Sequence, residues 1–308
     1  MSVARGAGMK ILISGSSGLI GSALVPFLAD FGYHITAILR KKPKKASSSD
    51  IVWDLEEQKI TQGSLEGFDV VIHLAGEQIS SGRWTAERKK LIYESRIGST
   101  KLLVKELRRL KQPPKLFISA SAVAYYGDRG DSWLDEKKRY GHGFLASLCH
   151  DWEKAANALK AKGSRVVRLR LGAVLSPDGG FLKRMLLPFQ MGLGGRVGSG
   201  EQFISWISIL DVLKAIRHIL FHEEIHGPVN IVSPQPVRNK DFAKILGSVL
   251  RRPSSFPLPE AAARLFFGQM AQELLLAGSR VKPVKLIASD YEFIHKDLSA
   301  ALEELISL

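Results

Sequence analysis

The sequence has only one cysteine, Cys149, so no disulfide bond can form within the chain. A single thiol is typical of proteins in a reducing compartment. Long apolar runs are also missing, because none approaches the roughly 20 residues that span a bilayer. The stretch from Met1 to Gly8 lacks the apolar core of a secretory signal. We therefore expect a cytoplasmic protein that does not enter the membrane.

Acidic residues are fewer than basic residues. The chain has 44 Lys and Arg against 30 Asp and Glu, and its formal net charge is +14. Such an excess attracts phosphorylated or polyanionic partners. Part of it lies in one window that holds Arg40, Lys41, Lys42, Lys44 and Lys45. No aromatic residue separates these cations and no recognition motif accompanies them, so nucleic acid is not an expected partner.

The chain alternates between short apolar runs and helical patterns. The runs that predict strands are Lys10–Ser14, His34–Leu39, Ile51–Trp53, Asp69–Leu74, Leu116–Ser119, Val166–Leu171 and Val229–Val232. The clearest helical patterns are Glu87–Leu110, Phe144–Leu159 and Val212–Phe221. Strands that alternate with helices predict an α/β fold: a Rossmann-like, doubly wound parallel sheet with helices on both faces.

We divide the chain into a nucleotide-binding domain and a smaller lobe. The domain is expected to cover residues 9–175, with residues 205–232 returning to it. The lobe is expected to combine residues 176–204 and 233–308, because the chain becomes rich in proline and then helical from about Pro253. The glycine-rich stretch Leu182–Gly200 has no clear pattern and is a candidate lid.

Three glycines follow the first predicted strand directly. The segment Gly15-Ser16-Ser17-Gly18-Leu19-Ile20-Gly21 has the spacing G-x-x-G-x-x-G and opens a predicted helix. Glycine allows a tight turn and a close approach of the backbone to a pyrophosphate, and the helix presents unpaired N–H groups to the phosphates. In this strand–turn–helix context the motif predicts a dinucleotide site.

The end of the second strand indicates which dinucleotide is bound. Sites that prefer NAD place Asp or Glu there to hold the ribose hydroxyls, whereas this chain has Arg40 and Lys41. A guanidinium matches a 2′-phosphate with paired donors, so NADP(H) is the predicted cofactor. Asp54, which closes the third strand, is a candidate acceptor for the adenine amino group. The small residues of Leu74-Ala75-Gly76 would let the backbone pass beneath the cofactor.

Several motifs together resemble a known family. They include Asp69–Gly76, Ser119–Gly127, Asp151-Trp152-Glu153 and Leu193-Gly194-Gly195. From Met9 to its end the chain resembles the extended short-chain dehydrogenase/reductases, and within them the atypical epimerase family 39U, some of whose members are labelled cell-division inhibitors. The resemblance implies NADP(H) contacts from the glycine loop, Arg40, Leu74, Ala75, Arg96 and Val174. It also implies a homodimer through the two long helices, and it leaves the substrate open.

The usual catalytic pair of that wider family is missing. No tyrosine has a lysine four residues later, and the positions of the Tyr-x-x-x-Lys pair correspond to Leu145 and Cys149. Ser121 aligns with the usual Ser/Thr, and Tyr125 is the preferred proton donor, with Tyr126 and Glu77 as other candidates. His73 is expected to be a core residue.

Two functions remain open, and neither uses a metal. His218, His222 and His226 recur every four residues, but the first two lie off the apolar stripe of their helix, so no metal site is predicted. The favoured function is an NADP(H)-dependent oxidoreductase or epimerase acting on an unknown small or nucleotide-linked substrate, in a pocket floored by Ser121. The alternative is a non-catalytic NADP(H)-sensing regulator of a protein partner in cell division, with an apolar patch on Pro253–Leu276.

Overall fold

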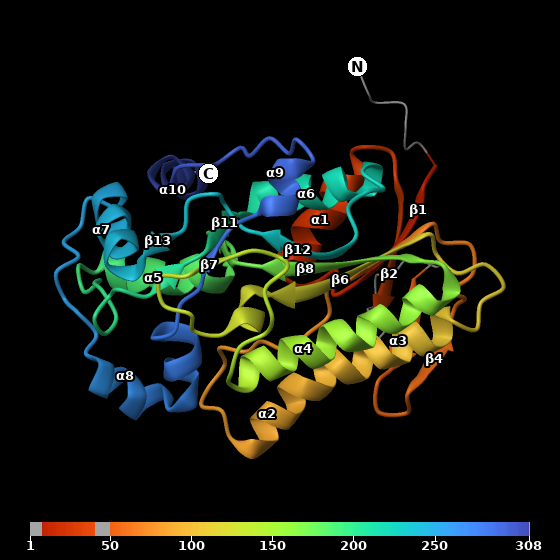
Figure 1. Cartoon of the computed structure of the whole chain (residues 1–308), viewed down its shortest axis with the longest axis horizontal. Helices are drawn as coiled ribbons and strands as arrows, with labels where there is room; N and C mark the ends of the chain where they lie inside the picture. The colour runs from red at the N-terminus through yellow and green to blue at the C-terminus, as the bar shows by residue number, and fades with distance from the viewer. Residues whose placement is uncertain (1–7, 41–49, 308) are drawn as a thin grey trace.

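An eight-stranded sheet forms the centre of the larger part of the protein. The computed structural model describes residues 8–40 and 50–307. The strand order is β12-β8-β6-β5-β1-β2-β3-β4 (Figure 1). The strands are β1 Lys10–Ser14, β2 His34–Leu39, β3 Ile51–Asp54, β4 Lys59–Gln62, β5 Val70–His73, β6 Leu116–Ala122, β8 Arg165–Leu171 and β12 Gly227–Ile231. Neighbouring strands are parallel except β4, which runs antiparallel to β3.

Helices cover both faces of this sheet. On one face lie α1 (Leu19–Ala29) and α6 (Ile209–Phe221), and on the other lie α3 (Ser99–Leu107) and α4 (Phe144–Asn157) (Figure 1). Alternate residues of each strand point to opposite faces. In β1, Ile11 and Ile13 pack against the first pair of helices, and Leu12 packs against the second pair. This arrangement confirms the predicted Rossmann-like α/β fold.

The predicted helix Glu87–Leu110 consists of three segments. α2 (Ala86–Tyr93) passes into a π-helix at Glu94–Gly98, which continues as α3. A π turn changes the direction in which the following side chains point, and such turns are frequent at functional sites. The spacing of apolar residues could not reveal this turn, because it shifts the helical pattern by only one residue.

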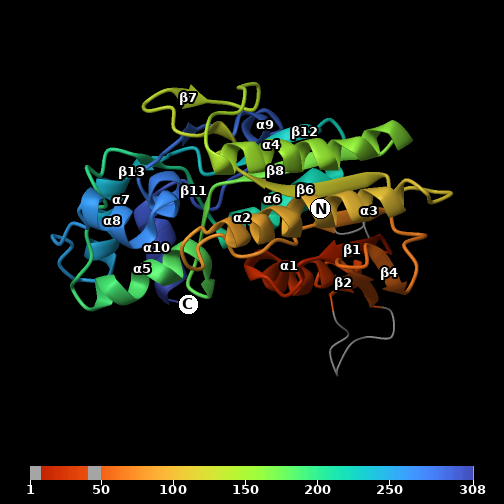
Figure 2. The same ribbon diagram turned by 90° about the horizontal axis from the view of Figure 1, so that it is seen from below.

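The second lobe is mainly helical and lies at one end of the sheet (Figure 2). Its helices are α5 Gly180–Gln190, α7 Asn239–Val249, α8 Glu260–Phe267 and α10 Leu298–Ser307. Side chains of α5, α7 and α10 share one apolar core, which includes Leu182, Phe242 and Leu302. The stretch Leu182–Gly200, which the sequence left unassigned, therefore contains most of α5.

The remaining elements are short. The strands are β7 Trp133–Leu134, β9 Ala173–Ser176, β10 Phe203–Ile204, β11 Trp206–Ser208, β13 Val237–Arg238 and β14 Arg280–Val281. They pair as β9 with β11, β10 with β13 and β7 with β14. The helical pieces are 3-10 turns at Val123–Tyr126 and Ala158–Lys162, a π-helix at Ala271–Leu275, and α9 Val284–Ala288.

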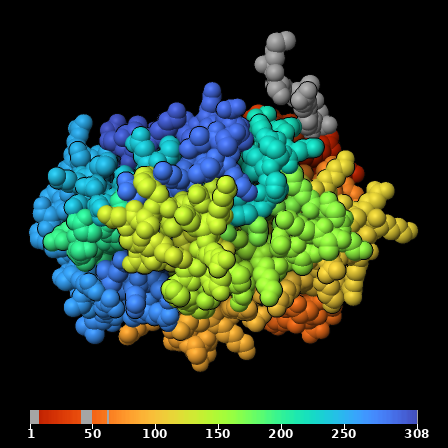
Figure 3. Space-filling model, in the orientation of Figure 1, coloured from red at the N-terminus to blue at the C-terminus, as the bar shows by residue number. Residues whose placement is uncertain are grey.

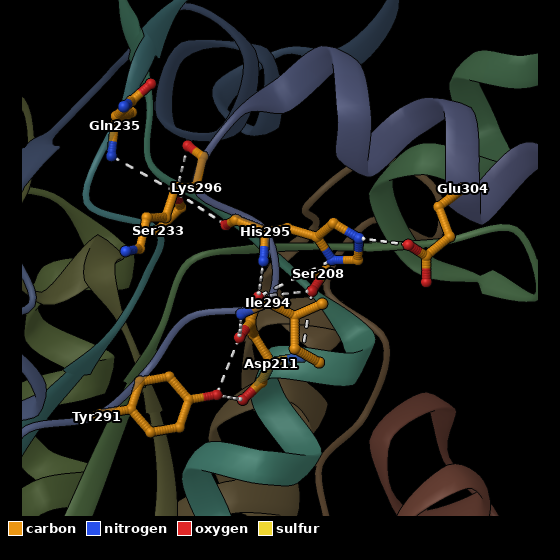
Figure 4. Close-up of polar contacts among 9 residues, drawn as sticks. All are labelled: Ser208, Asp211, Ser233, Gln235, Tyr291, Ile294, His295, Lys296 and Glu304. Atoms are coloured by element: carbon orange, nitrogen blue, oxygen red, sulfur yellow. Dashed lines mark hydrogen bonds and ion pairs between the residues drawn. The ribbon is translucent and has the colours of Figure 1, made fainter.

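A buried carboxylate ties the C-terminal segment to the start of α6 (Figure 4). Asp211 is fully buried and accepts hydrogen bonds from the Tyr291 hydroxyl at 2.9 Å and from the backbone N–H groups of Ile294 at 2.8 Å and His295 at 2.9 Å. The Ser208 hydroxyl donates a further bond at 3.0 Å. Burial raises the pKa of Tyr291 above its usual range, and the neighbouring Asp211 carboxylate raises it further, so the phenol stays protonated as a donor.

Within residues 8–40 and 50–307, no helix has the length and apolar character that crossing a membrane requires.

Candidate functional site

The glycine loop lies over the end of β5. Gly15 has φ +74°, and a Cβ on it would lie 2.7 Å from the carbonyl carbon of Leu74. A Cβ on Gly21 would lie 2.1 Å from the carbonyl oxygen of Gly15. Real side chains do not fit at such distances, so both positions require glycine. The loop is therefore packed as tightly as a pyrophosphate-binding turn demands.

The first turn of α1 faces the same space. Gly18 is the residue that caps the helix, and it has no side chain to satisfy the exposed N–H groups. These groups and the positive end of the helix dipole suit an anion. Ser16, Leu19 and Ile20 are partly exposed here, and Ser17 is exposed.

The sheet register brings the other predicted contacts to this edge. Ser14 pairs with Ile38 of β2 and with His73 of β5. Because the strands are parallel, Arg40 and the Leu74–Gly76 segment emerge beside the glycine loop. Arg40 is exposed, as a group that binds a phosphate from solvent would be. Lys41 lies outside the described residues.

Asp54 also ends a strand at this edge, but its carboxylate supports a turn. Its Oδ1 accepts hydrogen bonds from the backbone N–H groups of Glu56 and Glu57, both at 2.9 Å. The proposed contact of Asp54 with an adenine amino group remains a prediction.

Arg96 comes from the π-helix and packs on Gly76. A Cβ on Gly76 would lie 3.1 Å from the guanidinium carbon of Arg96, and the Trp152 ring centre lies 5.3 Å from that carbon. Burial lowers the pKa of Arg96. Among the described residues no carboxylate lies within ion-pair distance of it. A half-buried cation with no paired anion, beside a glycine at the nucleotide edge, is suited to hold a negatively charged or polar ligand.

The β9 segment and the start of α5 approach the glycine loop. Val174 and Ile20 pack against the same two apolar clusters. A Cβ on Gly180 would lie 2.9 Å from Cδ2 of Leu19 and 3.7 Å from the carbonyl oxygen of Val174. The structure thus brings the glycine loop, Arg40, Leu74–Gly76 and Val174 to one edge of the sheet.

His73 is a core residue, as expected. It is fully buried, and its ring nitrogens lie 2.5 Å from the Ser14 hydroxyl and 2.9 Å from the Thr100 hydroxyl. Burial lowers the pKa of His73 to about 3, so the ring is neutral at physiological pH. Its burial and hydrogen bonds make it a packing residue of the sheet.

Ser121 is engaged inside the protein. It is 2% exposed, and its hydroxyl donates to Glu153 Oε1 at 3.0 Å. Glu153 is itself buried and forms a bidentate pair with Arg170, with Nε–Oε1 2.7 Å and Nη2–Oε2 3.0 Å. This geometry favours a supporting role for Ser121 over the direct substrate contact that the sequence suggested.

The buried network continues beyond Arg170. Its guanidinium donates to the Tyr126 hydroxyl at 2.9 Å, and that hydroxyl donates to Asn230 Oδ1 at 2.7 Å. Burial raises the pKa of Tyr126 to about 12. Tyr126 is completely buried, so this network does not present it to a substrate.

Tyr125 has a different environment. Its ring lies under the Arg170 guanidinium, 3.6 Å from ring centre to Cζ, and it is only partly buried. In the part of the chain that the structure describes, its hydroxyl has no hydrogen-bond partner. Glu77, the other candidate proton donor, pairs with Arg88 at 3.1 Å. Tyr125 is therefore the candidate whose hydroxyl is available.

The positions of the missing catalytic pair are closed. Leu145 and Cys149 are 4% and 3% exposed. Burial raises the pKa of Cys149 to about 12, so its thiol is protonated and unreactive at neutral pH. Leu145 shares an apolar cluster with Trp84 and with Met270 of the second lobe.

The second lobe also caps α4, the helix that carries these positions. The Glu273 carboxylate accepts hydrogen bonds from the backbone N–H groups of Phe144 at 3.1 Å and Leu145 at 2.8 Å. A carboxylate at a helix N-terminus is stabilised by the helix dipole. Nothing in the spacing of residues pointed to this contact, because Glu273 and Phe144 are distant in sequence.

His218 lies at the end of α6, and His222 follows it directly. The His218 and His222 rings stack with centres 3.6 Å apart, and His218 Nε2 lies 2.9 Å from the Ser289 hydroxyl. Across residues 8–40 and 50–307, no group of three His, Cys, Asp or Glu side chains is arranged to hold a metal ion.

Comparison with known proteins places the chain in a family. Residues 11–232 match the NAD dependent epimerase/dehydratase family. The chain belongs to this epimerase/dehydratase family. Residues 258–305, in the second lobe, match a domain of unknown function, DUF1731.

Relatives match the epimerase/dehydratase chain over nearly its full length. An epimerase family protein of Mycobacterium bovis is 39% identical over 292 residues, which cover 95% of this chain and 96% of the relative. The human epimerase family protein SDR39U1 is 36% identical over 302 residues, which cover 97% of this chain and 100% of the relative. These matches confirm the resemblance to epimerase family 39U.

Solved structures agree with this assignment. The crystal structure of human SDR39U1 (isoform 2) with NADPH superposes with a TM-score of 0.89 at 34% identity, covering 97% of this chain and 99% of that one. A UDP-galactose 4-epimerase superposes with a TM-score of 0.73 at 18% identity, which shows a shared fold.

Proposed function

We propose that this epimerase/dehydratase family member binds NADP(H) at the edge of the sheet formed by the glycine loop. The observation that carries the proposal is the geometry of the glycine loop. Neither Gly15 nor Gly21 has room for a Cβ, and Arg40 follows β2 beside them. Arg40 would hold the 2′-phosphate that distinguishes NADP(H) from NAD(H). The NADPH in the human SDR39U1 structure supports the same choice.

Each part of the site would hold a different part of the cofactor. The N–H groups at the start of α1 would bind the pyrophosphate, and Leu74–Gly76 would lie beneath the nicotinamide ribose. Val174 would contact the nicotinamide end. Arg96 packs beside Gly76 and approaches Cys149, where the missing lysine of the catalytic pair would stand. We therefore assign Arg96 as the cation that holds the ribose in this chain.

We further propose that the protein is an oxidoreductase or epimerase acting on a small or nucleotide-linked substrate. NADP(H) supplies the hydride in such chemistry. The protein must move a proton to or from the substrate oxygen, and Tyr125 is the available hydroxyl for that step. Arg170, 3.6 Å from the Tyr125 ring, would hold the ring in place.

A second candidate is a non-catalytic NADP(H)-sensing regulator of a protein partner. Two observations favour it. Leu145 and Cys149 stand at the positions of the usual Tyr-x-x-x-Lys pair, and both are buried, as is Ser121. The second lobe exposes large apolar side chains in the predicted region, with Phe256 59%, Leu265 71% and Phe266 63% exposed.

Oxidation of bound NADPH by a generic acceptor separates the two candidates. The purified chain would be saturated with NADPH and mixed with 9,10-phenanthrenequinone, and the loss of absorbance would be compared with that of free NADPH. The enzyme predicts faster oxidation than in free solution, and a decrease of about 10²-fold or more in Tyr125→Phe. The regulator predicts that bound NADPH is oxidised no faster than free NADPH and that Tyr125→Phe changes nothing.

We also propose a cytosolic location. Its support is the composition, since the one thiol of the chain, Cys149, is free and buried.

A further inference from the structure

Two basic side chains meet beside the edge strand β12. Gly227, the first residue of β12, has φ +73°. A Cβ on this glycine would lie 3.3 Å from Nη2 of Arg168 in β8 and 3.5 Å from Nζ of Lys285 in α9. Among the described residues, no other atom outside the glycine and its chain neighbours lies within 4 Å of that point. The two cations therefore flank one open space, which we call the Gly227 site.

The Gly227 site is separate from the nucleotide edge. β12 is divided from β1, which carries the glycine loop, by β8, β6 and β5. At about 4.8 Å per strand this is a separation of roughly 19 Å. β12 and α9 lie on one side of α4 and α3 lies on the other (Figure 2), and both α4 and α9 reach the face of the molecule drawn in Figure 3.

Arg168 is only weakly paired. The Glu153 carboxylate forms its two short hydrogen bonds with Arg170 and lies 3.6 Å from Nη1 of Arg168. The Arg168 side chain is 16% exposed, and its Nε is buried without a hydrogen-bond partner among the described residues. Burial lowers the pKa of Arg168, although Glu153 opposes this effect. Arg168 thus keeps N–H donors for a further acceptor.

Lys285 lacks a close carboxylate as well. Its ammonium group donates to the carbonyl oxygen of His226, and in the described part of the chain no carboxylate lies within ion-pair distance of it. Glu136 attracts it from further away, but the Oε1 atom of Glu136 accepts hydrogen bonds from two backbone N–H groups. Burial lowers the pKa of Lys285, and the like charges of Arg168 and Lys160 lower it further. The site therefore carries an excess of positive charge.

A bound anion would relieve this excess. Two partly buried cations without a shared carboxylate repel each other, and the repulsion is stronger than it would be in water. A phosphate group fits the donors, because a guanidinium offers several N–H groups in one plane and an ammonium adds another toward the same point. Lys160, which is exposed, would attract the anion from solvent.

We propose that the Gly227 site binds a phosphate group, either as free phosphate or as a phosphomonoester of a small molecule. The phosphate oxygens would accept hydrogen bonds from Nη2 of Arg168 and Nζ of Lys285. The absence of a side chain on Gly227 leaves room for them between the two cations. The site does not depend on bound NADP(H), because it shares no residue with the nucleotide edge.

Thermal unfolding of the whole chain tests the site. The melting temperature is measured against the concentration of inorganic phosphate, with the ionic strength held constant by sodium chloride. We expect a saturable rise, which gives an apparent Kd. Lys285→Gln and Arg168→Gln should each weaken phosphate binding by about 10-fold or more, because each removes a charged donor. Lys285 is the more exposed of the two residues, so Lys285→Gln keeps the test valid if Arg168→Gln does not fold.

Two control variants show where the phosphate binds. Lys214→Gln removes an exposed lysine of α6, on the opposite face of the sheet, and should change the apparent Kd by less than about 3-fold. Arg40→Ala removes the cation of the nucleotide edge and should keep a saturable response to phosphate. A response that survives in Arg40→Ala and is lost in Lys285→Gln supports the Gly227 site, whether or not the chain binds NADP(H).

Glycerol 3-phosphate distinguishes the two sources of the phosphate group. If it stabilises the parent chain as inorganic phosphate does, and Lys285→Gln weakens both effects, the site accepts a phosphomonoester. If only inorganic phosphate acts through Lys285, the ligand is free phosphate. Two results would overturn the proposal: equal stabilisation of the parent, Lys285→Gln and Arg168→Gln by phosphate, or no rise in melting temperature beyond that in matched sodium chloride.

Discussion

The Glu153 carboxylate is the centre of the buried polar network, and its removal gives the sharpest test of how that network is built. Glu153→Gln keeps the size of the side chain and its contact with Ser121, but removes the negative charge. Arg170, which is 2% exposed, would lose its charged acceptor and keep neutral ones: the amide oxygen of the new side chain, the Tyr126 hydroxyl at 2.9 Å and the Glu136 carbonyl at 3.4 Å. Arg168, 3.6 Å from the same carboxylate, would also lose its partner.

The expected cost follows from burial. Breaking a buried ion pair by removing one partner costs about 3–5 kcal/mol, because the other charge remains desolvated. For a chain of this size such a loss lowers the melting temperature by roughly 5–8 °C. The matched control is Glu106→Gln, which breaks the exposed pair with Arg109 and should cost about 0–1 kcal/mol.

Thermal and urea unfolding of the two variants and the parent chain measure these differences. Equal destabilisation by Glu153→Gln and Glu106→Gln would refute the account of the network as a buried, charge-compensated cluster.

Three other predictions concern the core and the loop. Burial raises the pKa of Cys149 to about 12, so the folded chain should not react with a thiol reagent at pH 8. The chain unfolded in guanidinium should react completely. Rapid labelling of the native protein would contradict the burial of this thiol. Because burial lowers the pKa of His73 from 6.5 to about 3, the unfolded chain binds a proton more readily between these values. The free energy of unfolding should therefore decrease as the pH drops from 6.5 towards 3, by up to about 1.4 kcal/mol per pH unit. Urea unfolding measures this pH dependence, and the contribution of His73 should be absent in His73→Gln. In Gly21→Ala the new Cβ would lie 2.1 Å from the Gly15 oxygen, so NADPH should no longer raise the melting temperature in a thermal shift assay. The neighbouring variant Ser22→Ala should still be stabilised by NADPH. If NADPH stabilises both variants equally, the loop tolerates a side chain.

The fold was largely predictable because its signals are local. Strand runs such as His34–Leu39 have the bounds expected from their apolar residues, and the alternation with helices fixes a parallel sheet. The edge strand β4 and the two-residue strands were missed, since such short segments have little periodicity. The π-helix at Glu94–Gly98 was missed for a related reason, as one extra residue hardly alters the helical pattern.

The candidate site likewise has a part that the sequence predicted and a part that it did not. The glycine loop was predictable because backbone geometry demands glycine at Gly15 and Gly21. The buried network was not, because it depends on side-chain contacts such as Glu153 with Arg170. The cap on α4 was not either, because Glu273 and Phe144 are far apart in sequence. One signal was available: the charged residues Arg168 and Arg170 within a predicted buried strand require buried partners.

Isothermal titration calorimetry with NADPH and NADH, on the parent chain and Arg40→Ala, tests the central claim most directly. The parent should bind NADPH more tightly than NADH. Loss of a charge-assisted contact with the 2′-phosphate, worth about 1.5–3 kcal/mol, should weaken NADPH binding by about 10–100-fold and leave NADH binding nearly unchanged. Equal affinity for the two cofactors in the parent, or NADPH binding that Arg40→Ala leaves unaltered, would contradict the assignment of this edge as an NADP(H) site.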